Sequence, residues 1–188
     1  PALSPCPSAA QPLRIVVWAW ERPEDLHYID PNKVEVAALV QTVLISAASM
    51  KIRKREQSLR LPKGVKVIAV TRVETDRRCG AQLTNEQLAQ LSTAIVDSCR
   101  SARGVQIDFD AKVSERAFYR KLLNAVRDKL PKGKLLSMTS LASWSFFDNW
   151  LGDDSPVDEV VPMFFSLGGG NLEVMDLLKR DQLLNVIY

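Results

Sequence analysis

Six short runs of apolar residues, many of them β-branched, recur along the chain, and the segments between them limit the fold more than any other feature. Runs of this length and composition predict buried strands. The predicted strands are residues 14–20, 36–46, 65–73, 105–110, 135–141 and 157–165. The predicted helices are residues 84–100, 114–130 and 172–179, with a short helix or loop at 144–151. Strands separated by helices pair in parallel, so the sequence predicts an α/β fold.

Start signals and apolar spacing support the first two helices. Thr84 and Gln87 form the capping-box pattern, in which each side chain bonds to the backbone of the other residue. Leu91 and Ile95 follow at the spacing of one helix face. We expect Ser114 to cap the second helix, because serine oxygens accept bonds from the free N–H groups of a first turn.

Two architectures fit this order of elements, a (β/α) barrel and an open doubly wound sheet. A nucleotide-binding open sheet requires GxGxxG directly after its first strand, whereas residues 18–22 read Trp-Ala-Trp-Glu-Arg. The difference favours a TIM-type (β/α) barrel. We expect its first connections to be irregular, with a turn or short helix near residues 24–28 and an extended excursion or hairpin over residues 50–61.

The chain is short for a complete barrel of this type. Eight strands with their helices usually take about 250 residues, whereas this sequence has 188. It predicts six strands, with residues 183–188 as a candidate seventh. We therefore expect an incomplete barrel or a fragment of a longer one. Because an unpaired parallel edge promotes association, we also expect a homodimer or a C-terminal segment to cover that edge.

Composition places the sequence among single-domain globular proteins, with 46% hydrophobic and 25% charged residues. Residues 1–13 are rich in Pro, Ser and Ala and predict a flexible linker, and residues 14–188 predict one barrel domain. Such a tail often follows an export signal, which favours a secreted or periplasmic location slightly. No apolar run reaches the roughly 18 residues of a membrane span, so we expect none.

The charge balance is mild, with 25 Lys and Arg against 22 Asp and Glu and a formal net charge of +3. Without a recognised nucleic-acid-binding module, this excess does not predict nucleic acid as a partner. Part of it is concentrated in residues 51–55, Lys-Ile-Arg-Lys-Arg. We interpret this segment as a solvated hairpin or loop face, with a polyanion site as the alternative.

Metal and cofactor signals are weak in this sequence. Cys6, Cys79 and Cys99 show neither CxxC nor His/Cys metal spacing, and a disulfide such as Cys79 to Cys99 stays open. His27, the only histidine, lies in a predicted turn without a Cys or Asp partner at ligand or triad spacing. A Ser-His-Asp mechanism therefore lacks its base. We expect no metal and no cofactor.

Candidate functional residues lie near the carboxyl ends of the predicted strands, where a barrel builds its active face. Aromatic rings stack on the apolar faces of sugars, so this set favours a carbohydrate ligand. The candidate substrate-binding residues are Trp20, Arg72, Thr139, Trp144, Met163 and Phe165. Burial in the core is the alternative for aromatic residues, and we favour it for Trp18 and Trp150.

Asp108 and Asp110 lie two residues apart in a predicted strand, so both side chains are expected on the same face. Two carboxylates so close cannot both ionise freely, and one pKa should rise, as a general acid requires. The alternative is structural, with one Asp capping the next helix and the other pairing with Arg72. Arg72 and Glu74 also share a strand face and suit a mutual or a cross-strand ion pair. A D-x-D metal site lacks a third hard ligand nearby.

Residues 104–110, Gly-Val-Gln-Ile-Asp-Phe-Asp, resemble the strand-four signature of chitinase-type glycoside hydrolases, Asp-Gly-x-Asp-x-Asp-x-Glu, whose Glu is the proton donor. In this resemblance Asp110 stands at the Glu position and Asp108 at the middle Asp, while Gln106 replaces the first Asp of the strand. Residues 161–166 look like the Met-x-Tyr-Asp motif of strand six in the same superfamily. Phe and Ser replace its Tyr and Asp, so the groups of the substrate-assisted route are absent.

Over most of its length the chain is also similar to an uncharacterised bacterial domain-of-unknown-function family with glycosidase-like TIM barrels. Five segments in the same order and spacing carry this resemblance. They are residues 17–20 (VWAW), 70–74 (VTRVE), 106–110 (QIDFD), 136–144 (LSMTSLASW) and 157–164 (VDEVVPMF). The resemblance implies a barrel and a carbohydrate ligand, without an established activity.

The sequence therefore favours a glycoside-hydrolase-like protein that hydrolyses a glycosidic bond in a poly- or oligosaccharide. Asp110 is the candidate general acid and Asp108 tunes it. Glu74 or Glu21 supplies a second carboxylate, whereas Asp158 precedes its strand and would lie at the wrong end of the barrel. The alternative is a carbohydrate-binding or scaffold protein that kept the barrel without the chemistry.

Overall fold

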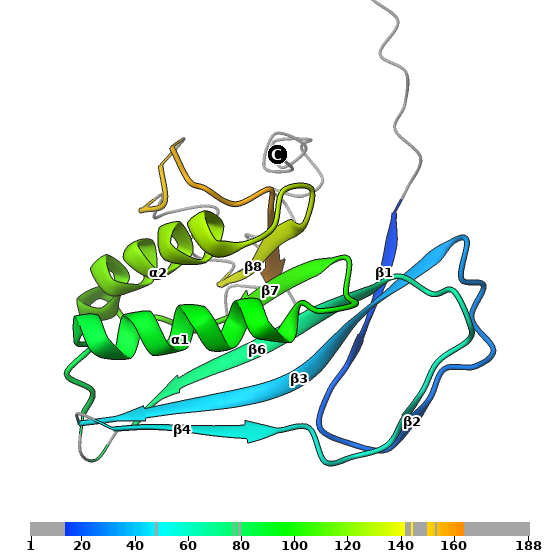
Figure 1. Cartoon of the computed structure of the whole chain (residues 1–188), viewed down its shortest axis with the longest axis horizontal. Helices are drawn as coiled ribbons and strands as arrows, with labels where there is room; N and C mark the ends of the chain where they lie inside the picture. Colours follow the sequence, from blue (N-terminus) through cyan, green and yellow to red (C-terminus); the bar gives the residue numbers. More distant parts are fainter. Residues whose placement is uncertain are drawn as a thin grey trace, which may run out of the picture.

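The computed structural model shows a curled parallel sheet with two helices on its outer face (Figure 1). The structure describes residues 14–163 except 48, 77, 79, 142–143, 145–149 and 153. Along the sheet the strands are β1 (Ile15–Ala19), β3 (Val34–Ser46), β6 (Val67–Thr75), β7 (Gly104–Asp108), β8 (Leu135–Leu141) and β9 (Glu159–Met163). Neighbours in this order pair in parallel and follow the order of the chain. A doubly wound sheet would reverse its order, so the sheet is that of an incomplete (β/α) barrel.

Extended segments rather than helices connect the first three of these strands. β4 (Ser49–Lys54) folds back antiparallel on β3, and β2 (Glu24–Asp25) pairs with β5 (Leu59–Arg60). Leu26 and Leu59 from these connections pack over the outer side of β1 and β3. This small cluster covers the part of the sheet that has no helix. The extended path expected for residues 50–61 is confirmed.

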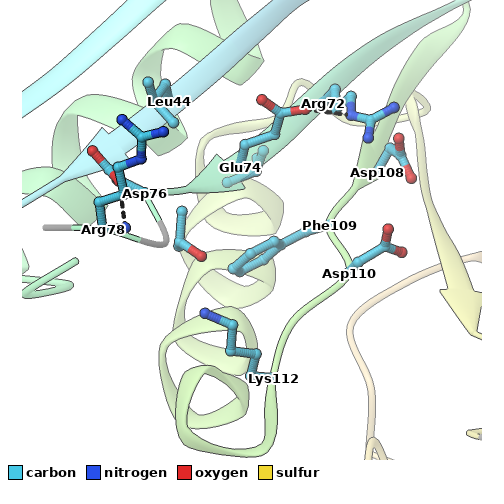
Figure 2. Close-up of a pocket in the computed structure, with 11 residues that line it drawn as sticks. Leu44, Arg72, Glu74, Asp76, Arg78, Asp108, Phe109, Asp110 and Lys112 are labelled. Carbon is cyan, nitrogen blue, oxygen red and sulfur yellow. Dashed lines mark hydrogen bonds and ion pairs between the residues drawn. The ribbon is translucent and has the colours of Figure 1, made fainter. Parts of the chain in front are cut away.

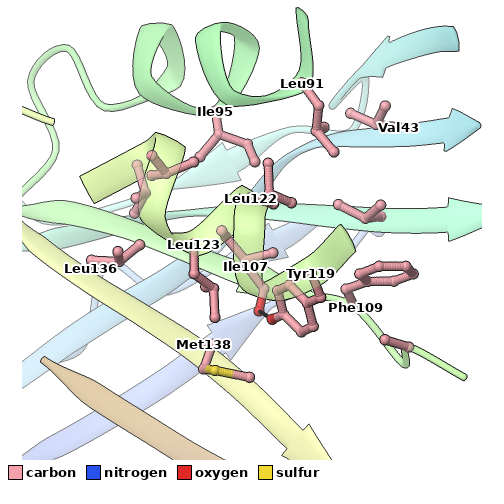
Figure 3. Packing of buried hydrophobic residues seen from close by; sticks show 14 of the residues in the cluster. Val43, Leu91, Ile95, Ile107, Phe109, Tyr119, Leu122, Leu123, Leu136 and Met138 are labelled. Atoms are coloured by element: carbon pink, nitrogen blue, oxygen red, sulfur yellow. Dashed lines mark hydrogen bonds between the residues drawn. The ribbon is translucent and has the colours of Figure 1, made fainter. Parts of the chain in front are cut away.

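The helices α1 (Asn85–Ser98) and α2 (Arg116–Lys129) cover the rest of the outer face. Alternate residues of each strand face them, because side chains along a strand point to opposite sides. Ile107 of β7 packs against this layer in the main core, together with Leu91 and Leu122 (Figure 3). The capping box at Thr84 and Gln87 is present as predicted. Burying several such side chains supplies about 1.5–3 kcal/mol each.

The prediction that Ser114 caps α2 is wrong. Ser114 lies inside a short 3-10 turn, η1 (Val113–Glu115), and forms no capping bond. Glu115 is the N-cap residue of α2 instead, without a side-chain capping bond to the helix. Its carboxylate accepts the backbone N–H of Lys112 at 2.8 Å and the hydroxyl of Thr75 at 2.8 Å. A buried acid with two donors ties the start of the helix to the end of β6.

Polar side chains bridge the inner face of the sheet. The indole N–H of Trp18 on β1 donates to Gln106 Oε1 on β7 at 2.8 Å, and Gln106 Nε2 donates to Ser137 Oγ on β8 at 2.9 Å. β1 and β7 are not neighbours in the sheet, so this bond crosses the interior of the curl. Trp18 is therefore part of the inner core, as expected.

Ion pairs connect the two edges of the described sheet at its amino-terminal end. Arg14, just before β1, forms two bonds with Glu159 of β9, at 2.9 and 3.1 Å. The same guanidinium lies 3.1 Å from Glu35 at the start of β3, and Arg103 reaches Glu35 at 2.7 Å. We call Arg14, Glu35, Arg103 and Glu159 the clasp. It holds the first and last described strands together although the six strands form an open sheet.

Several predictions lie outside the described residues. These are the linker 1–13, Phe165, the helix 172–179 and the strand 183–188. Cys99 is a buried free thiol, and burial raises its pKa. Cys79, the disulfide partner left open by the sequence, lies outside the described residues. No helix in the described part of the chain has the length and apolar character to cross a membrane.

Candidate active site

A cleft of about 500 Å³ opens at the carboxyl ends of β6 and β7 (Figure 2). In a (β/α) barrel the loops after the strands converge at this end, which makes it the expected position of a functional site. Charged residues dominate the lining. They include Arg72 and Glu74 from β6, Asp108 from the end of β7, and Asp110 and Lys112 from the loop that follows.

Asp108 is the last residue of β7 and is only 6% exposed. Its Oδ1 accepts the hydroxyl of Thr139 on the neighbouring strand β8 at 2.8 Å. Burial is the largest influence on this carboxyl and raises its pKa, and the nearby charges of Asp110 and Glu74 act in the same direction. The Thr139 bond and the positive charge of Arg72 oppose the rise without cancelling it. Asp108 is therefore an acid that holds its proton to a higher pH than usual.

Asp110 lies two residues further on and is exposed. Figure 2 shows its carboxylate on the same side of the chain as that of Asp108, as the spacing predicts, with Phe109 turned the other way. Within the described residues, no hydrogen bond or ion pair reaches the Asp110 carboxylate. The pair predicted from the sequence is thus present at the cleft, and the raised pKa belongs to Asp108.

Arg72 and Glu74 form an ion pair at 2.9 Å, with both side chains about 45% exposed. Both residues line the cleft, as the sequence predicts. The mutual pair expected from their shared strand face is present. Arg72 therefore has Glu74 as its ion-pair partner, while its effect on Asp108 is a weaker electrostatic one.

The remaining predicted binding residues do not gather at this cleft. Thr139 is buried and acts through its bond to Asp108. Trp144 is only 6% exposed and packs edge-on against Trp150 at 5.2 Å, within the core on the helix side. Trp20 packs in the inner cluster of the sheet, and Met163 ends β9 half-buried. Both tryptophans are large apolar groups, and packing them in the core buries more of their surface than an exposed position would.

Sequence reasoning missed Leu44, Asp76 and Lys112, which also line the cleft. Asp76 directly follows β6, and Lys112 lies in the loop after β7, so their position after a strand was an available signal. Leu44 gives no such signal, because it lies inside the long strand β3 and reaches the cleft through the register with β6.

The other acids considered from the sequence lie elsewhere. Glu21 accepts the backbone N–H groups of Glu56 and Gln57, and these bonds lower its pKa. Asp158 accepts from Arg127 and from the backbone of Leu136 at the amino-terminal end, as its position before β9 predicts.

His27 is exposed and has an acidic partner, because its Nδ1 lies 2.6 Å from Asp25 Oδ1. Within the described residues, no group of three or more metal-ligating side chains comes together.

The incomplete (β/α) barrel described above is similar in fold to barrels of solved chitinase-type proteins. Solved structures similar to this chain include a protein assigned as chitinase A from Streptomyces coelicolor, with a TM-score of 0.56, 10% identity and 82% of this chain covered. The chitinase domain of the spore coat protein CotE from Clostridium difficile gives 0.51, 11% and 85%. The spore cortex-lytic enzyme SleL from Bacillus cereus gives 0.54, 17% and 83%.

The chain spans only part of the structures it matches, covering 61%, 52% and 42% of the three in that order. No protein-family model and no curated protein matches the sequence. At these sequence identities, the similarity to the three solved structures establishes the fold alone. The distant similarity to chitinase-type enzymes inferred from residues 104–110 is confirmed at that level.

Proposed function

We propose that the chain binds a poly- or oligosaccharide in the cleft and hydrolyses a glycosidic bond there. The observation that carries this proposal is the pair of carboxyl groups, Asp108 and Asp110, on one side of the chain at the carboxyl end of β7. The fold similarity to chitinase-type barrels supports the same class of substrate. Glycoside hydrolysis requires a carboxylic acid that is protonated near neutral pH together with a second carboxylate.

The two members of the pair have different environments and therefore different roles. Asp108 is buried and bonded to Thr139, whereas Asp110 is exposed to the cleft. Burial, aided by the nearby charge of Asp110, raises the pKa of Asp108, so Asp108 is the member that holds the proton. Asp110 is the member that reaches substrate. It passes the proton of Asp108 to the glycosidic oxygen as the bond to the anomeric carbon breaks.

Completion of the reaction needs water and a second carboxylate. Water adds its oxygen to the anomeric carbon and loses a proton to that carboxylate, for which we assign Glu74. Arg72 holds Glu74 at 2.9 Å and fixes its orientation in the lining of the cleft. The products are two saccharides, and the proton balance of the site is restored when the proton returns to the Asp108 and Asp110 pair.

A saccharide-binding protein without catalysis is the second candidate. The observation that favours it is that two of the three carboxylates assigned to the reaction already have partners, Glu74 with Arg72 and Asp108 with Thr139. A site used only for binding has less need of a carboxyl group without a partner. Asp110 is such a group among the described residues, and we therefore place hydrolysis first.

Substitution of Asp110 by Asn separates the two candidates. Chitin and peptidoglycan oligosaccharides are incubated with the wild type, with Asp110→Asn and with Asp97→Asn, which removes a charge from an exposed position on α1. New reducing ends measure cleavage, and calorimetry measures binding. Hydrolysis predicts a rate about 10²–10⁴-fold lower in Asp110→Asn alone, with binding retained. Binding without cleavage by the wild type supports the second candidate, and cleavage by Asp110→Asn at the wild-type rate contradicts the role of Asp110.

A further inference from the structure

The basic segment at residues 51–55 begins on β4 and ends with Arg55, just after that strand. β4 pairs with β3, and β3 pairs with β6, whose carboxyl end lines the cleft. Figure 1 shows β4 alongside β3, at the edge of the same sheet. The sequence alone indicated a solvated face here, with a polyanion site as the alternative. The register of the sheet decides which of its cations face the site.

Directly opposed residues of paired strands have their side chains on the same face. Arg53 opposes Thr42, Thr42 opposes Arg72, and Arg72 opposes Asp108. One row of side chains therefore runs across four strands from Arg53 to the buried acid of the site. With strands about 4.8 Å apart, the ends of this row are at most about 14 Å from each other. A short oligosaccharide spans such a distance.

The next row on this face runs parallel to the first. Lys51 opposes Leu44, and Leu44 opposes Glu74. Leu44 and Glu74 both line the cleft, so the face that carries Lys51 and Arg53 is continuous with it. Lys51 and Arg53 thus form a two-residue cationic edge to the site, which we call the β4 edge.

The cations of residues 51–55 differ in what they contact. Lys54 donates to the side chain of Gln41, and Arg55 donates to backbone carbonyls that include those of Trp20 and Arg22. By contrast, Lys51 and Arg53 are exposed and form no ion pair or hydrogen bond with any described residue. The segment therefore divides into two cations with a structural role and two whose charge is available to a ligand.

Two acids near the β4 edge, Glu21 and Glu74, are occupied by other bonds. Glu21 interacts electrostatically with Arg53, but its Oε1 accepts two backbone N–H groups, of Glu56 and Gln57. Glu74 is paired with Arg72. The face consequently changes from carboxyl groups at Asp108 and Asp110 to positive charge on β4. A ligand that matches it has its scissile bond at the acids and a negative group several strands away.

We infer that the saccharide is anionic, with carboxylate groups on its sugars, and that Lys51 and Arg53 bind one of these carboxylates while the reacting bond lies at Asp110. This inference rests on the proposed function, because it names the substrate class of the same cleft. A guanidinium binds a carboxylate through two parallel N–H donors, and the ammonium of Lys51 adds a second charge. Such contacts weaken as salt is added.

The test compares ligands that differ only in charge. Hyaluronan oligosaccharides carry carboxylates on alternate sugars, and chemical reduction of these carboxyls gives the neutral counterpart. Affinity is measured for the wild type, for Lys51→Gln/Arg53→Gln, and for Lys132→Gln, which removes an exposed charge at the opposite end of the barrel. We expect the charged form to bind the wild type about tenfold more tightly than the reduced form, and the double substitution alone to abolish this difference. A single-stranded oligonucleotide serves as an unrelated polyanion.

Equal affinity for the charged and reduced forms overturns the inference, as does the same loss in Lys132→Gln or equal binding of the oligonucleotide. Cleavage measured in the same samples separates this result from the proposed function. Charge-dependent binding through the β4 edge without cleavage supports the inference and contradicts hydrolysis. Cleavage of a neutral oligosaccharide with no effect of charge supports hydrolysis and contradicts the inference.

Discussion

The two ends of the barrel use charge in opposite ways. At the amino-terminal end, Arg14, Glu35, Arg103 and Glu159 satisfy one another within the clasp. At the carboxyl end, Asp110 and the β4 edge have no bonded partner among the described residues, and burial raises the pKa of Asp108. Paired charges stabilise a fold, whereas charges held apart from partners are available to a ligand. This difference supports our proposal that the carboxyl end holds the functional site, without reference to any similar protein.

The largest effect we expect is at the amino-terminal end, from Gly104→Ala. Gly104 begins β7, and an added Cβ would lie 2.2 Å from the backbone oxygen of Leu135 on the paired strand. Because backbone atoms cannot rotate away, β7 and β8 must move apart. We expect a loss of about 3 kcal/mol in the free energy of unfolding, measured by urea titration.

Gly64→Ala is the matched control for this substitution. Gly64 has a positive φ of 85° and no atom within 4 Å of an added Cβ, so backbone strain alone acts there. That strain costs about 1–2 kcal/mol. Equal losses in the two variants would contradict the close approach of β7 to β8.

The second prediction removes the centre of the clasp by Glu35→Gln. Glu35 is buried, and its carboxylate lies within bonding distance of Arg14 and Arg103. The amide keeps the shape and removes the charge, which leaves two guanidinium groups without their shared partner. Because both arginines are about one-third exposed, we expect a loss of about 2 kcal/mol, less than for a fully buried pair.

Asp154→Asn provides the comparison for Glu35→Gln. Asp154 pairs with Arg120 at 3.4 Å, and its side chain is 82% exposed, so its loss should change the free energy of unfolding by less than about 0.5 kcal/mol. Both variants are measured by urea titration at low salt. The clasp would have no structural role if Glu35→Gln were as stable as Asp154→Asn.

The helices and strands at both ends of the barrel were predictable, because capping residues and the spacing of apolar residues determine them. Thr84 and Gln87 supply the cap of α1, and the alternation in Val105–Gln106–Ile107 decides which side chains face the helices. Periodicity also placed Asp108 and Asp110 on one side. These inferences need only neighbours in the sequence, where strand and helix geometry fix the direction of side chains.

Contacts between distant strands were not predictable from the same patterns. The Thr139 bond to Asp108 depends on β7 and β8 register, and the Arg14 bond to Glu159 depends on how strongly the sheet curls. A shift of one residue in any strand pair would turn these side chains to the other face. The position of Trp144 failed to follow from the sequence for a related reason, since an aromatic residue suits both a sugar platform and a core.

The third prediction concerns the stability of the functional end. In Asp108→Asn, the amide oxygen still accepts the Thr139 hydroxyl, while the buried charge is removed. The folded protein raises the pKa of Asp108, so folding favours its protonated form. Wild-type stability relative to the variant is therefore highest below the usual Asp pKa of about 3.9 and falls as pH rises through the raised value.

Thermal unfolding of both proteins from pH 3 to pH 8 measures this difference. At neutral pH we expect Asp108→Asn to have the higher melting temperature and to have lost hydrolytic activity. A wild type that gains stability over the variant as pH rises would contradict the sign of the shift. This outcome would sharpen the comparison of the two ends, because a stabilising substitution that keeps the shape of the side chain indicates that the ionisable carboxyl of Asp108 is kept at a cost in stability.

The smallest effect on the free energy of unfolding is expected from Arg53→Gln. Its contrast with an arginine of the clasp tests the comparison of the two ends most directly. Arg53 is exposed and has no bonded partner among the described residues, so its loss should change the free energy of unfolding by less than about 0.5 kcal/mol. Arg14→Gln removes the same kind of side chain from the clasp and leaves Glu35 and Glu159 without it. We expect about 1–2 kcal/mol of destabilisation there. If Arg53→Gln were the more destabilising variant in urea titration, the cations of β4 would belong to the fold, and their charge would not be available to bind a ligand.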